Sequence, residues 1–326
     1  MTSGHSRTVR AMAATSYGDP AQVVGPVDAA IPPPGPGQAV VDVRAAGVNP
    51  IDGKIVRGLF GTDPAALPRR IGSEVSGVVT AVGAGARYFA PAEADRREIH
   101  AGDEVIVYRA IGGYAEALLA DADSVHPKPA TLPFPTAAGL LLVGVTAADL
   151  VGAAKITGSD TVVVHGGAGA VGAIAVQLAR RRGATVIATA APRNHEFLAG
   201  LGAVPVAYGA GVAQRIHAAA RRPVTAALDT AGTDEAIDAS LDLGISPARI
   251  VSIAAFGRGT DGIVIVDGST ADSRRRRSAA IGGLIADATS GELTVEIAKT
   301  FPLEQAGQAL AELAGPHSRG KFVLLP

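Results

Sequence analysis

A short apolar run that breaks into closely spaced glycines constrains the fold of this chain more than any other feature. Residues 161–165 read Thr-Val-Val-Val-His, and residues 166–172 read Gly-Gly-Ala-Gly-Ala-Val-Gly. An all-apolar strand of this length is typical of a parallel sheet that is buried on both faces. The spacing G-x-G-x-x-G allows a tight turn, a close approach of backbone to pyrophosphate, and close packing of the next helix on the strand. The pattern predicts a strand, a turn and a helix that bind a dinucleotide through Gly167, Ala168, Gly169, Ala170, Val171 and Gly172.

The composition of the chain leaves room for a purely structural glycine turn, and it argues against nucleic-acid binding as the main function. With 41 glycines in 326 residues, some matches arise by chance, so a purely structural glycine turn is the alternative. Hydrophobic residues make up 48% of the chain and charged residues 18%, which is typical of a globular protein rather than a disordered one. A net charge of −1 argues against a nucleic-acid surface as the main function.

The segment after the second predicted strand indicates which dinucleotide binds. Residues 184–190 form that strand, and a chain that binds NAD usually carries an acidic residue at its end to hold the ribose 2′-hydroxyl. This chain instead carries Thr189 and, after Pro192, Arg193. A hydroxyl and a guanidinium suit a 2′-phosphate, whereas a carboxylate would repel it. The sequence therefore favours NADPH over NADH. The alternative is that Arg193 is a solvated residue in the first turn of a helix behind Pro192.

Two kinds of pattern divide the chain. Up to residue 126, short strand candidates are separated by turn residues, which predicts a small, irregular β-barrel-like domain; these candidates are 39–44, 75–82, 104–107 and 114–119. From about residue 127, strands and helices alternate, which predicts a doubly wound parallel sheet. After the glycine turn the expected strands are 184–190, 204–207, 225–229 and 249–254, and the expected helices are 193–201, 212–221 and 235–241. The tail 294–326 returns to strand, helix and strand, and we expect it to rejoin the first domain.

Several features limit the compartment and the surface chemistry. The chain has no cysteine, which excludes disulfides, thiolate nucleophiles and cysteine-ligated zinc. Its first ten residues lack the apolar core of a signal peptide, and the longest apolar stretch, 137–148, is too short to span a bilayer. We therefore expect a soluble cytoplasmic protein without a membrane partner. The basic run Arg274 to Arg277 is interpreted as a solvated helix face, with an anion-binding role as the alternative, and 86–101 as a surface loop or short helix.

Motifs along nearly the whole chain resemble one enzyme family. They are Val-Arg-Ala-Ala-Gly-Val-Asn-Pro-Ile-Asp at 43–52, Ile-Gly-Ser-Glu-Val-Ser-Gly-Val-Val at 71–79, Gly-Asp-Glu-Val at 102–105 with Gly-Tyr-Ala-Glu at 113–116, Gly-Val-Thr-Ala at 144–147, the glycine turn, and Gly-Lys-Phe-Val-Leu at 320–324. Together they resemble the zinc-free, quinone oxidoreductase or zeta-crystallin-like group of the medium-chain dehydrogenase/reductase superfamily. The resemblance implies an α/β protein with a GroES-like β-barrel-type catalytic domain, residues 1–126 completed by 267–326, and a Rossmann NADP-binding domain, residues 127–266.

The resemblance also implies roles for individual residues. Asn49 stands where zinc-dependent members carry a cysteine ligand, so no catalytic metal is expected, and Asn49 would sit beside nicotinamide and substrate; a turn former before Pro50 is the alternative. The other residues implied to contact the cofactor are Thr146 on the nicotinamide side, Thr189 and Arg193 at the 2′-phosphate, Tyr208 at the adenosine end, Phe256 and Gly257 lining the nicotinamide, and Lys321 in the tail. His165 is a departure, because relatives mostly carry a small residue there.

The predicted function is hydride transfer from NADPH to a quinone or an α,β-unsaturated carbonyl without zinc. Asn49 or Tyr114 would donate a hydrogen bond to the developing oxyanion, although Tyr114 is more often a packed strand aromatic. Candidate residues of the substrate cleft are Asp52, for which a helix N-cap is an equal alternative, Arg57, Phe60, Tyr108 and Arg109. The rival functions are an enoyl-thioester or specialised biosynthetic reductase, and an NADPH-binding crystallin-like or regulatory protein with little turnover. A homodimer is expected, with 262–266 as the candidate edge strand.

Overall fold

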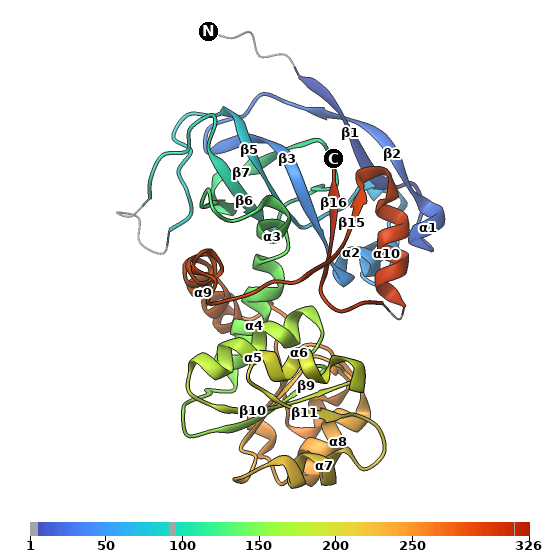
Figure 1. The fold of residues 1–326 in the computed structure, drawn as a ribbon. Coiled ribbons are helices and arrows are strands. Elements are labelled where there is room, and N and C mark those ends of the chain that lie inside the picture. The colour runs from blue at the N-terminus through green and yellow to red at the C-terminus, as the bar shows by residue number, and fades with distance from the viewer. Residues whose placement is uncertain (1–5, 91–95, 316) are drawn as a thin grey trace. The chain divides into compact units, whose positions relative to one another are not determined.

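The structure, a computed structural model, describes residues 6–90, 96–315 and 317–326. The chain folds into two compact units (Figure 1). Unit 1 contains Met1–Leu142 and Val295–Pro326, and unit 2 contains Val143–Thr294. The tail thus belongs with the N-terminal residues, as predicted.

Unit 2 is built on a six-stranded parallel sheet with the strand order β11-β10-β9-β12-β13-β14. Counted from β9 as the first strand, this order is 3-2-1-4-5-6, the usual order of a dinucleotide-binding Rossmann sheet. The central strand β9 is buried along its whole length, as its apolar sequence predicts. The strands are β9 (Thr161–His165), β10 (Thr185–Ala190), β11 (Val204–Ala207), β12 (Ala226–Asp229), β13 (Ile250–Ser252) and β14 (Val264–Ile265). The predicted doubly wound domain is therefore confirmed.

Helices alternate with these strands as predicted: four of them connect successive strands from β9 to β13, one precedes β9 and one follows β14 (Figure 1). They are α4 (Leu141–Ala153), α5 (Ala170–Arg181), α6 (His195–Gly200), α7 (Val212–Ala219), α8 (Asp234–Asp242) and α9 (Ala271–Ser290). Each predicted strand and helix after the glycine turn is present, with ends shifted by a few residues. The candidate edge strand 262–266 is observed as the two-residue β14 at the edge of the sheet, and its role in a homodimer stays a prediction.

Unit 1 is rich in β-structure. A seven-stranded sheet has the order β15-β16-β3-β5-β6-β8, with β7 paired to β3, and a three-stranded sheet has the order β2-β1-β4. The strands are β1 (Arg7–Ala14), β2 (Val24–Ile31), β3 (Gln38–Val48), β4 (Arg69–Arg70), β5 (Glu74–Val82), β6 (Glu104–Tyr108), β7 (Ala117–Asp121), β8 (Val125–Pro127), β15 (Ile297–Pro302) and β16 (Lys321–Leu325). The tail strand β16 pairs antiparallel with β3, which explains why the two chain ends share a unit.

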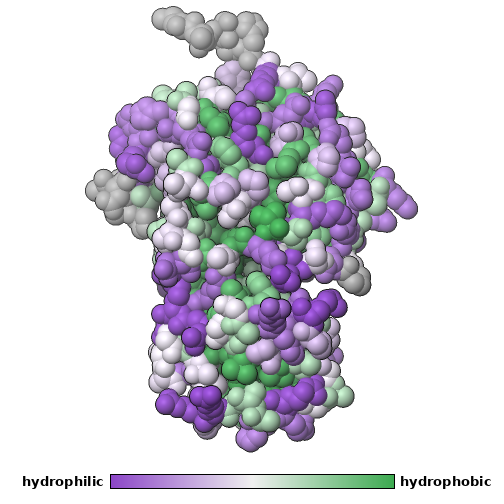
Figure 2. Space-filling view, in the orientation of Figure 1, coloured by the Kyte–Doolittle hydropathy of each residue, from purple (hydrophilic) through white to green (hydrophobic). Residues whose placement is uncertain are grey.

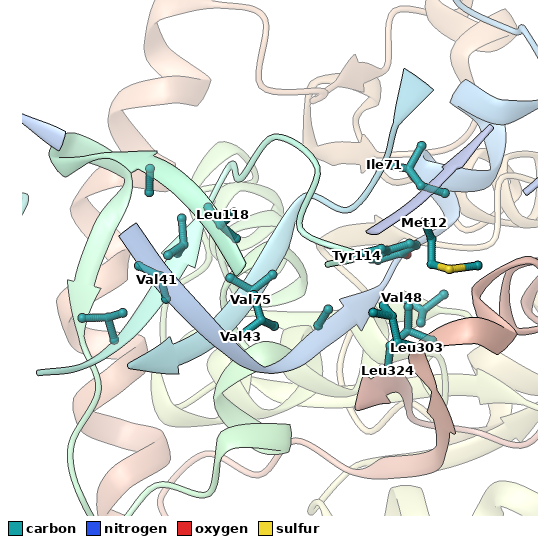
Figure 3. Packing of buried hydrophobic residues seen from close by; sticks show 14 of the residues in the cluster. Met12, Val41, Val43, Val48, Ile71, Val75, Tyr114, Leu118, Leu303 and Leu324 are labelled. Atoms are coloured by element: carbon teal, nitrogen blue, oxygen red, sulfur yellow. The ribbon is translucent and has the colours of Figure 1, made fainter. Parts of the chain in front are cut away.

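Short helices and one large apolar cluster complete unit 1. The helices are α1 (Pro20–Val23), α2 (Pro50–Val56), α3 (Phe134–Ala138) and α10 (Ala306–Ala314). Figure 3 shows part of the cluster, in which side chains from the start of the chain, such as Met12, lie beside Val48 of β3 and Leu303 and Leu324 of the tail. Burial of these residues joins segments that are almost 300 residues apart in sequence.

The units divide later along the chain than the predicted boundaries at 126/127 and 266/267. Residues 127–142 stay with unit 1 because buried polar contacts hold them there: Lys128 pairs with Glu104, Ser76 donates to the carbonyl of Phe134, and the Leu141 amide donates to Glu74. Helix α9 stays with unit 2, where it contacts α4 through Asp149. The antiparallel pair β1 and β2 was also not predicted.

The segment 86–101 differs from the expected surface loop in its described part. Tyr88 and Ile99 are buried and belong to the core cluster of unit 1, and Arg87 and Glu98 form an isolated β-bridge. Its central residues 91–95 lie outside the described residues. The sequence misled because polar residues dominate the segment, whereas two apolar side chains near its ends fix it to the core.

The basic run on α9 is only partly the solvated face that was predicted. Arg274 and Arg275 are exposed, but Arg276 and Arg277 donate to the two carboxylate oxygens of Asp149 at 2.7 and 2.9 Å. The Asp149 side chain is fully buried on α4. A buried carboxylate needs opposite charge, and the two arginines supply it. The run therefore fastens α9 to α4.

Loss of this carboxylate is expected to destabilise unit 2. Asp149→Asn leaves two arginines beside a neutral amide, and the expected fall in the free energy of unfolding is about 3 kcal/mol. Asp272→Asn is the matched control, because Asp272 pairs with Arg275 on the same helix while both side chains are exposed; its expected cost is below about 1 kcal/mol. Denaturant unfolding of both variants measures the difference, and equal costs would contradict the role given to Asp149.

The outer surface of the protein is mainly hydrophilic, as expected when apolar side chains are buried. Figure 2 shows hydrophilic residues, in purple, over much of the visible face of each unit, and smaller hydrophobic areas, in green, among these residues. Among the described residues, no helix combines the length and apolar character needed to cross a bilayer.

Candidate functional site

The glycine turn of unit 2 lies where β9 ends and α5 begins. Gly167 and Gly172 are required by the fold: a Cβ on Gly167 would come within 2.7 Å of the Ala188 side chain, and one on Gly172 within 2.2 Å of the Gly166 carbonyl. Thr230, which follows β12, donates to the carbonyl oxygens of His165 and Gly166 at 2.7 and 3.2 Å. Two of the three motif glycines thus allow the helix to pack closely on the strand, as the spacing predicts.

Gly169 differs from these two glycines. It is exposed and is the N-cap of α5, and its backbone is extended, with φ −71° and ψ 163°. A Cβ there would contact only the Gly166 carbonyl, at 3.3 Å, and would otherwise point into open space. As a glycine, it has no side chain that could cap the helix. The first-turn amides of a helix lack intrahelical partners and attract anions, so this end of α5 fits a pyrophosphate.

Three residues predicted at the adenosine end lie at the ends of neighbouring strands. Arg193 is exposed in the 3₁₀ turn η4 (Pro192–Asn194) after β10, and Tyr208 after β11 is 60% exposed. Thr189, in contrast, is buried, and its Oγ1 accepts the Gly166 N–H at 3.3 Å. Arg193 and Tyr208 can therefore reach a ligand, whereas the Thr189 hydroxyl is committed to the glycine turn and does not suit the predicted contact with a 2′-phosphate.

Of the remaining residues of unit 2 that were predicted to contact the cofactor, Phe256 and Gly257 are exposed and Thr146 is buried. Phe256 is 56% exposed at the start of the 3₁₀ turn η6 (Phe256–Asp261), and a Cβ on Gly257 would meet no atom within 4 Å. Thr146 is buried on α4. The turn that holds Phe256 is fixed by Arg258, which donates to Asp234, Asp238 and Asp261. Phe256 and Gly257 are thus accessible on an anchored segment.

In unit 1 the structure brings Asn49 and Lys321 together. Lys321, the first residue of β16, is buried, and its Nζ donates to Asn49 Oδ1 at 2.5 Å and to the Val48 carbonyl at 3.1 Å. Asn49 is fully buried, and its Nδ2 donates to the Gly47 carbonyl at 3.2 Å. These contacts fix which end of the amide carries oxygen. Lys321 therefore positions Asn49, and its ammonium group is not on the surface.

Glu74 and Asp52 provide the negative charge near Lys321. Glu74 Oε1 accepts the Leu142 N–H at 3.0 Å, while Oε2 is buried and accepts no hydrogen bond from the described residues. Burial raises the pKa of Glu74 to about 7, although the charge of Lys321 opposes this. Burial likewise raises the pKa of Asp52 and lowers that of Lys321. Because the pKa of Glu74 is about 7, this carboxyl group is partly protonated at neutral pH.

Asp52 and Tyr114 have structural partners inside unit 1. Asp52 accepts the Asn49 N–H at the start of α2, the Ser73 hydroxyl at 2.7 Å and the Tyr114 hydroxyl at 2.9 Å. Tyr114 is fully buried in the core cluster, beside Met12 in Figure 3, and burial raises its pKa well above the ordinary value. Asp52 is therefore the third residue of α2, and its carboxylate helps to cap the helix by accepting the backbone N–H of Asn49. The N-cap itself is Asn49, so the alternative prediction of an N-cap at Asp52 is wrong in position. The Tyr114 proton is directed at Asp52, which does not favour its predicted role as an oxyanion donor.

The other candidates for the substrate cleft lie on loops and strand ends of unit 1. Arg57 follows α2 and is exposed, and Phe60 is 63% exposed. Tyr108 is half-buried at the end of β6. Arg109 is exposed and has a φ of 66°, a left-handed conformation that is uncommon for a non-glycine residue and frequent at functional sites. Their contact with a substrate stays a prediction.

Sequence reasoning missed the buried Glu74. A signal was available, because a glutamate at the start of a strand that is otherwise uncharged and largely buried is unusual unless the carboxylate has internal partners.

The Glu74 pKa gives a testable pH dependence. Because the folded pKa of about 7 lies above the ordinary 4.5, the stability that Glu74 contributes is complete below pH 4.5 and is lost as the pH rises through 7. Glu74→Gln stays neutral and keeps an acceptor oxygen. Its free energy of unfolding relative to wild type is therefore expected to rise by about 3 kcal/mol between pH 4 and 7. Urea unfolding across this range measures it.

Glu98→Gln is the control for this measurement, because that side chain is 65% exposed. The control is expected to follow the wild-type pH profile. A Glu74→Gln profile parallel to wild type would show that Glu74 does not titrate in this range.

Family models and solved structures match this chain over most of its length. Residues 35–130 match the alcohol dehydrogenase GroES-like domain, and residues 201–324 match the zinc-binding dehydrogenase domain. A mycobacterial protein solved in complex with NADPH is 30% identical, with a TM-score of 0.82, and the alignment covers 98% of this chain and 100% of that one. The chain belongs to the medium-chain dehydrogenase/reductase superfamily, in its quinone oxidoreductase group.

Other members of the superfamily show the same likeness. The quinone oxidoreductase of Coxiella burnetii is 29% identical over 98% of this chain and 100% of its own, with a TM-score of 0.80. Mouse quinone oxidoreductase is 34% identical over 186 residues, which are 56% of this chain and 53% of the mouse protein. The chain thus spans about half the length of the curated relatives it matches. The predicted family and the GroES-like and Rossmann domains are confirmed.

Proposed function

We propose that this protein is an NADPH-dependent oxidoreductase that reduces a quinone or an α,β-unsaturated carbonyl compound. The observation that carries the proposal is the amino end of α5, whose N-cap is the exposed Gly169, a residue without a side chain. Membership of the superfamily supports it, as do relatives named quinone oxidoreductases and one structural neighbour solved with NADPH. When bound, the cofactor supplies the hydride.

The residues of this chain bind and orient the reactants in this proposal. The first-turn amides of α5 hold the pyrophosphate, and the exposed Arg193 guanidinium pairs with the 2′-phosphate, which favours NADPH over NADH. Phe256 and Gly257 line the nicotinamide side. Asn49 is fully buried and its amide is held by Lys321 and the Gly47 carbonyl, so its part in this proposal is to fix the start of α2 and not to contact the reactants. Conjugated carbonyl acceptors suit this set because negative charge delocalises over the acceptor as it forms.

The proposal includes hydride transfer without zinc. It is supported by the sequence, which has no cysteine and carries Asn49 where zinc-dependent relatives have a ligand. Dialysis against a strong chelator such as 1,10-phenanthroline is therefore expected to leave the rate of NADPH oxidation unchanged. A loss of activity that added zinc restores would contradict this part of the proposal.

Steady-state oxidation of NADPH tests the function. The full chain is assayed with a panel of quinones and enones, and at least one acceptor is expected to give saturable turnover that NADH supports less well. Absence of turnover with every acceptor, despite tight NADPH binding, would instead favour a cofactor-binding protein that is not an enzyme.

An enoyl-thioester reductase is the second candidate. It is favoured by the likeness to the spectinabilin polyketide synthase system protein NorB of Streptomyces orinoci, which is 37% identical over 181 residues, 55% of this chain and 8% of that protein. Polyketide chains are carried as thioesters, so a crotonyl thioester is the suitable probe. A kcat/KM for this thioester well above that for every quinone would select the second candidate.

A further inference from the structure

Thr189 holds two consecutive amides at the start of the glycine turn. Its carbonyl oxygen accepts the Gly167 N–H at 3.0 Å, and its Oγ1 accepts the Gly166 N–H at 3.3 Å. The side chain is 2% exposed at the end of β10. One residue of the neighbouring strand thus fixes the backbone that leads into the predicted pyrophosphate site.

His165 lies behind this contact. It is the last residue of β9 and is 2% exposed, and its ring nitrogens face two hydroxyl groups. Nδ1 is 3.4 Å from Thr189 Oγ1, and Nε2 is 3.0 Å from Ser240 Oγ on α8. Ser240 in turn donates its proton to the carbonyl oxygen of Ala236 at 2.8 Å. The histidine therefore connects the glycine turn to a helix that packs in the same unit.

Ser240 determines the direction of each hydrogen bond in the series that links Ser240, His165, Thr189 and Gly166. Its single proton is used on Ala236, so Ser240 Oγ accepts at His165 and Nε2 carries the ring proton. A neutral ring then has its lone pair on Nδ1, which accepts the Thr189 hydroxyl proton. A lone pair of Thr189 Oγ1 remains for the Gly166 N–H. In this series of hydrogen bonds, each proton on His165, Thr189 and Ser240 has an acceptor.

A charged histidine does not fit this arrangement. If Nδ1 also carried a proton, Thr189 Oγ1 would face two donors, and its own proton would need another acceptor in a buried place. Burial lowers the pKa of His165 to about 4, although the carboxylates of Asp229 and Glu235 favour the charged form. Asp229 already accepts the amides of Ala231 and Gly232. Burial and geometry agree that the ring is neutral at physiological pH.

We propose that His165 is a positioning residue for the dinucleotide-binding turn, acting through the Thr189 hydroxyl on the Gly166 amide. This inference rests on the proposed cofactor site and extends it: His165, Thr189 and Ser240 determine cofactor affinity without contacting the cofactor. It also gives Thr189 a different task from the predicted contact with the 2′-phosphate. Two side chains hydrogen-bond to the turn: Thr189 at the end of β10 and Thr230 after β12. His165 orients the Thr189 hydroxyl and so determines the first of these hydrogen bonds.

Removal of the Thr189 hydroxyl tests the proposal. Thr189→Val keeps the β-branched shape and leaves both the Gly166 N–H and His165 Nδ1 without partners. The dissociation constant for NADPH, measured by calorimetry on the full chain, is expected to rise about 5- to 20-fold. Thr189→Ser restores the hydroxyl and is expected to stay within about 3-fold of wild type. Thr185→Val, at the exposed start of the same strand, is the control and is expected to leave affinity unchanged.

The outcome separates positioning from packing. A Thr189→Val variant that melts at a lower temperature but binds NADPH as wild type does would show a packing role alone and overturn the proposal. Failure of the serine variant to restore affinity would overturn it as well.

A second measurement does not depend on cofactor binding. Nitrogen-15 NMR of the wild-type chain, with the His165 signals assigned by their loss in His165→Gln, is expected to show the neutral ring protonated at Nε2 from pH 6 to 8. A ring protonated at Nδ1, or a cationic ring, would overturn the hydrogen-bond chain. If wild type binds no NADPH, the proposed function fails, while this spectrum still decides the arrangement around His165.

Discussion

Replacement of Gly169 by aspartate is expected to raise the dissociation constant for NADPH at least about 100-fold while changing the free energy of unfolding by less than about 1 kcal/mol. The extended backbone of Gly169 is one that any residue adopts. A Cβ there would lie 3.3 Å from the Gly166 carbonyl, which must shift by a few tenths of an ångström, and would meet no other atom within 4 Å. Aspartate is also among the best N-cap residues, and the present N-cap, Gly169, has no side chain to serve as a cap. The gain from capping and the cost of shifting the Gly166 carbonyl oppose each other, so the helix should form about as well as before.

The loss of affinity arises from charge. A carboxylate at the N-cap would occupy the place of the pyrophosphate and repel it, and two unit charges 4 Å apart near a protein surface repel by on the order of 4 kcal/mol. Calorimetry gives the affinity and thermal unfolding gives the stability. Wild-type affinity in Gly169→Asp would mean that the cofactor does not bind at this helix.

Gly169→Asn is the matched control, because asparagine has the same shape and similar capping ability but no charge. Its loss of affinity is expected to be at least about 10-fold smaller than that of the aspartate variant. Equal losses in the two variants would show that bulk, and not charge, blocks the site.

Loss of the buried ammonium group is expected to have the largest effect on stability. Lys321→Met keeps most of the side-chain volume but leaves Asn49 Oδ1 without its donor and removes the positive charge beside Glu74 and Asp52. Breaking a buried charge cluster by removing one partner typically costs 3–5 kcal/mol, and we expect a loss of about 4 kcal/mol in the free energy of unfolding at pH 7. Denaturant unfolding measures this loss.

Two further variants separate the charge cluster from ordinary packing. Lys299→Met removes an ammonium group that pairs with Glu312 on the surface, where its side chain is 44% exposed, and its expected cost is below about 1 kcal/mol. The double variant Glu74→Gln with Lys321→Met is expected to be more stable than Lys321→Met alone. Without Lys321 the buried Glu74 must take up a proton at pH 7, and glutamine removes the free-energy cost of that protonation. If the two single changes were simply additive, Glu74 and Lys321 would not be coupled.

The sequence predicted those parts of the fold that repeat a local pattern. Alternating strands and helices after residue 160, the glycine turn and the return of the tail to the first domain were all predicted from periodicity, turn residues and family motifs. The hairpin of β1 and β2 was missed because its pairing is set by contacts with other strands rather than by its own composition. The length of the segment assigned to unit 1 was underestimated because side chains such as Glu74 and Ser76 hold it from a distance in sequence.

The candidate site was predicted by residue type more accurately than by side-chain environment. Gly169, Arg193, Tyr208 and Phe256 are accessible, as their roles require. Thr189, Tyr114 and Lys321 have the chemistry expected of cofactor or substrate contacts, but each is buried and has an internal partner. A hydroxyl or an ammonium group in a motif does not reveal whether it faces a ligand or a neighbouring strand, because tertiary packing decides this.

Titration of the full chain with NADPH by isothermal calorimetry tests the central claim most directly. One binding site per chain is expected, with a dissociation constant on the order of micromolar, together with weaker binding of NADH. No binding heat from either nucleotide at millimolar concentration, with the protein shown to be folded, would contradict the account.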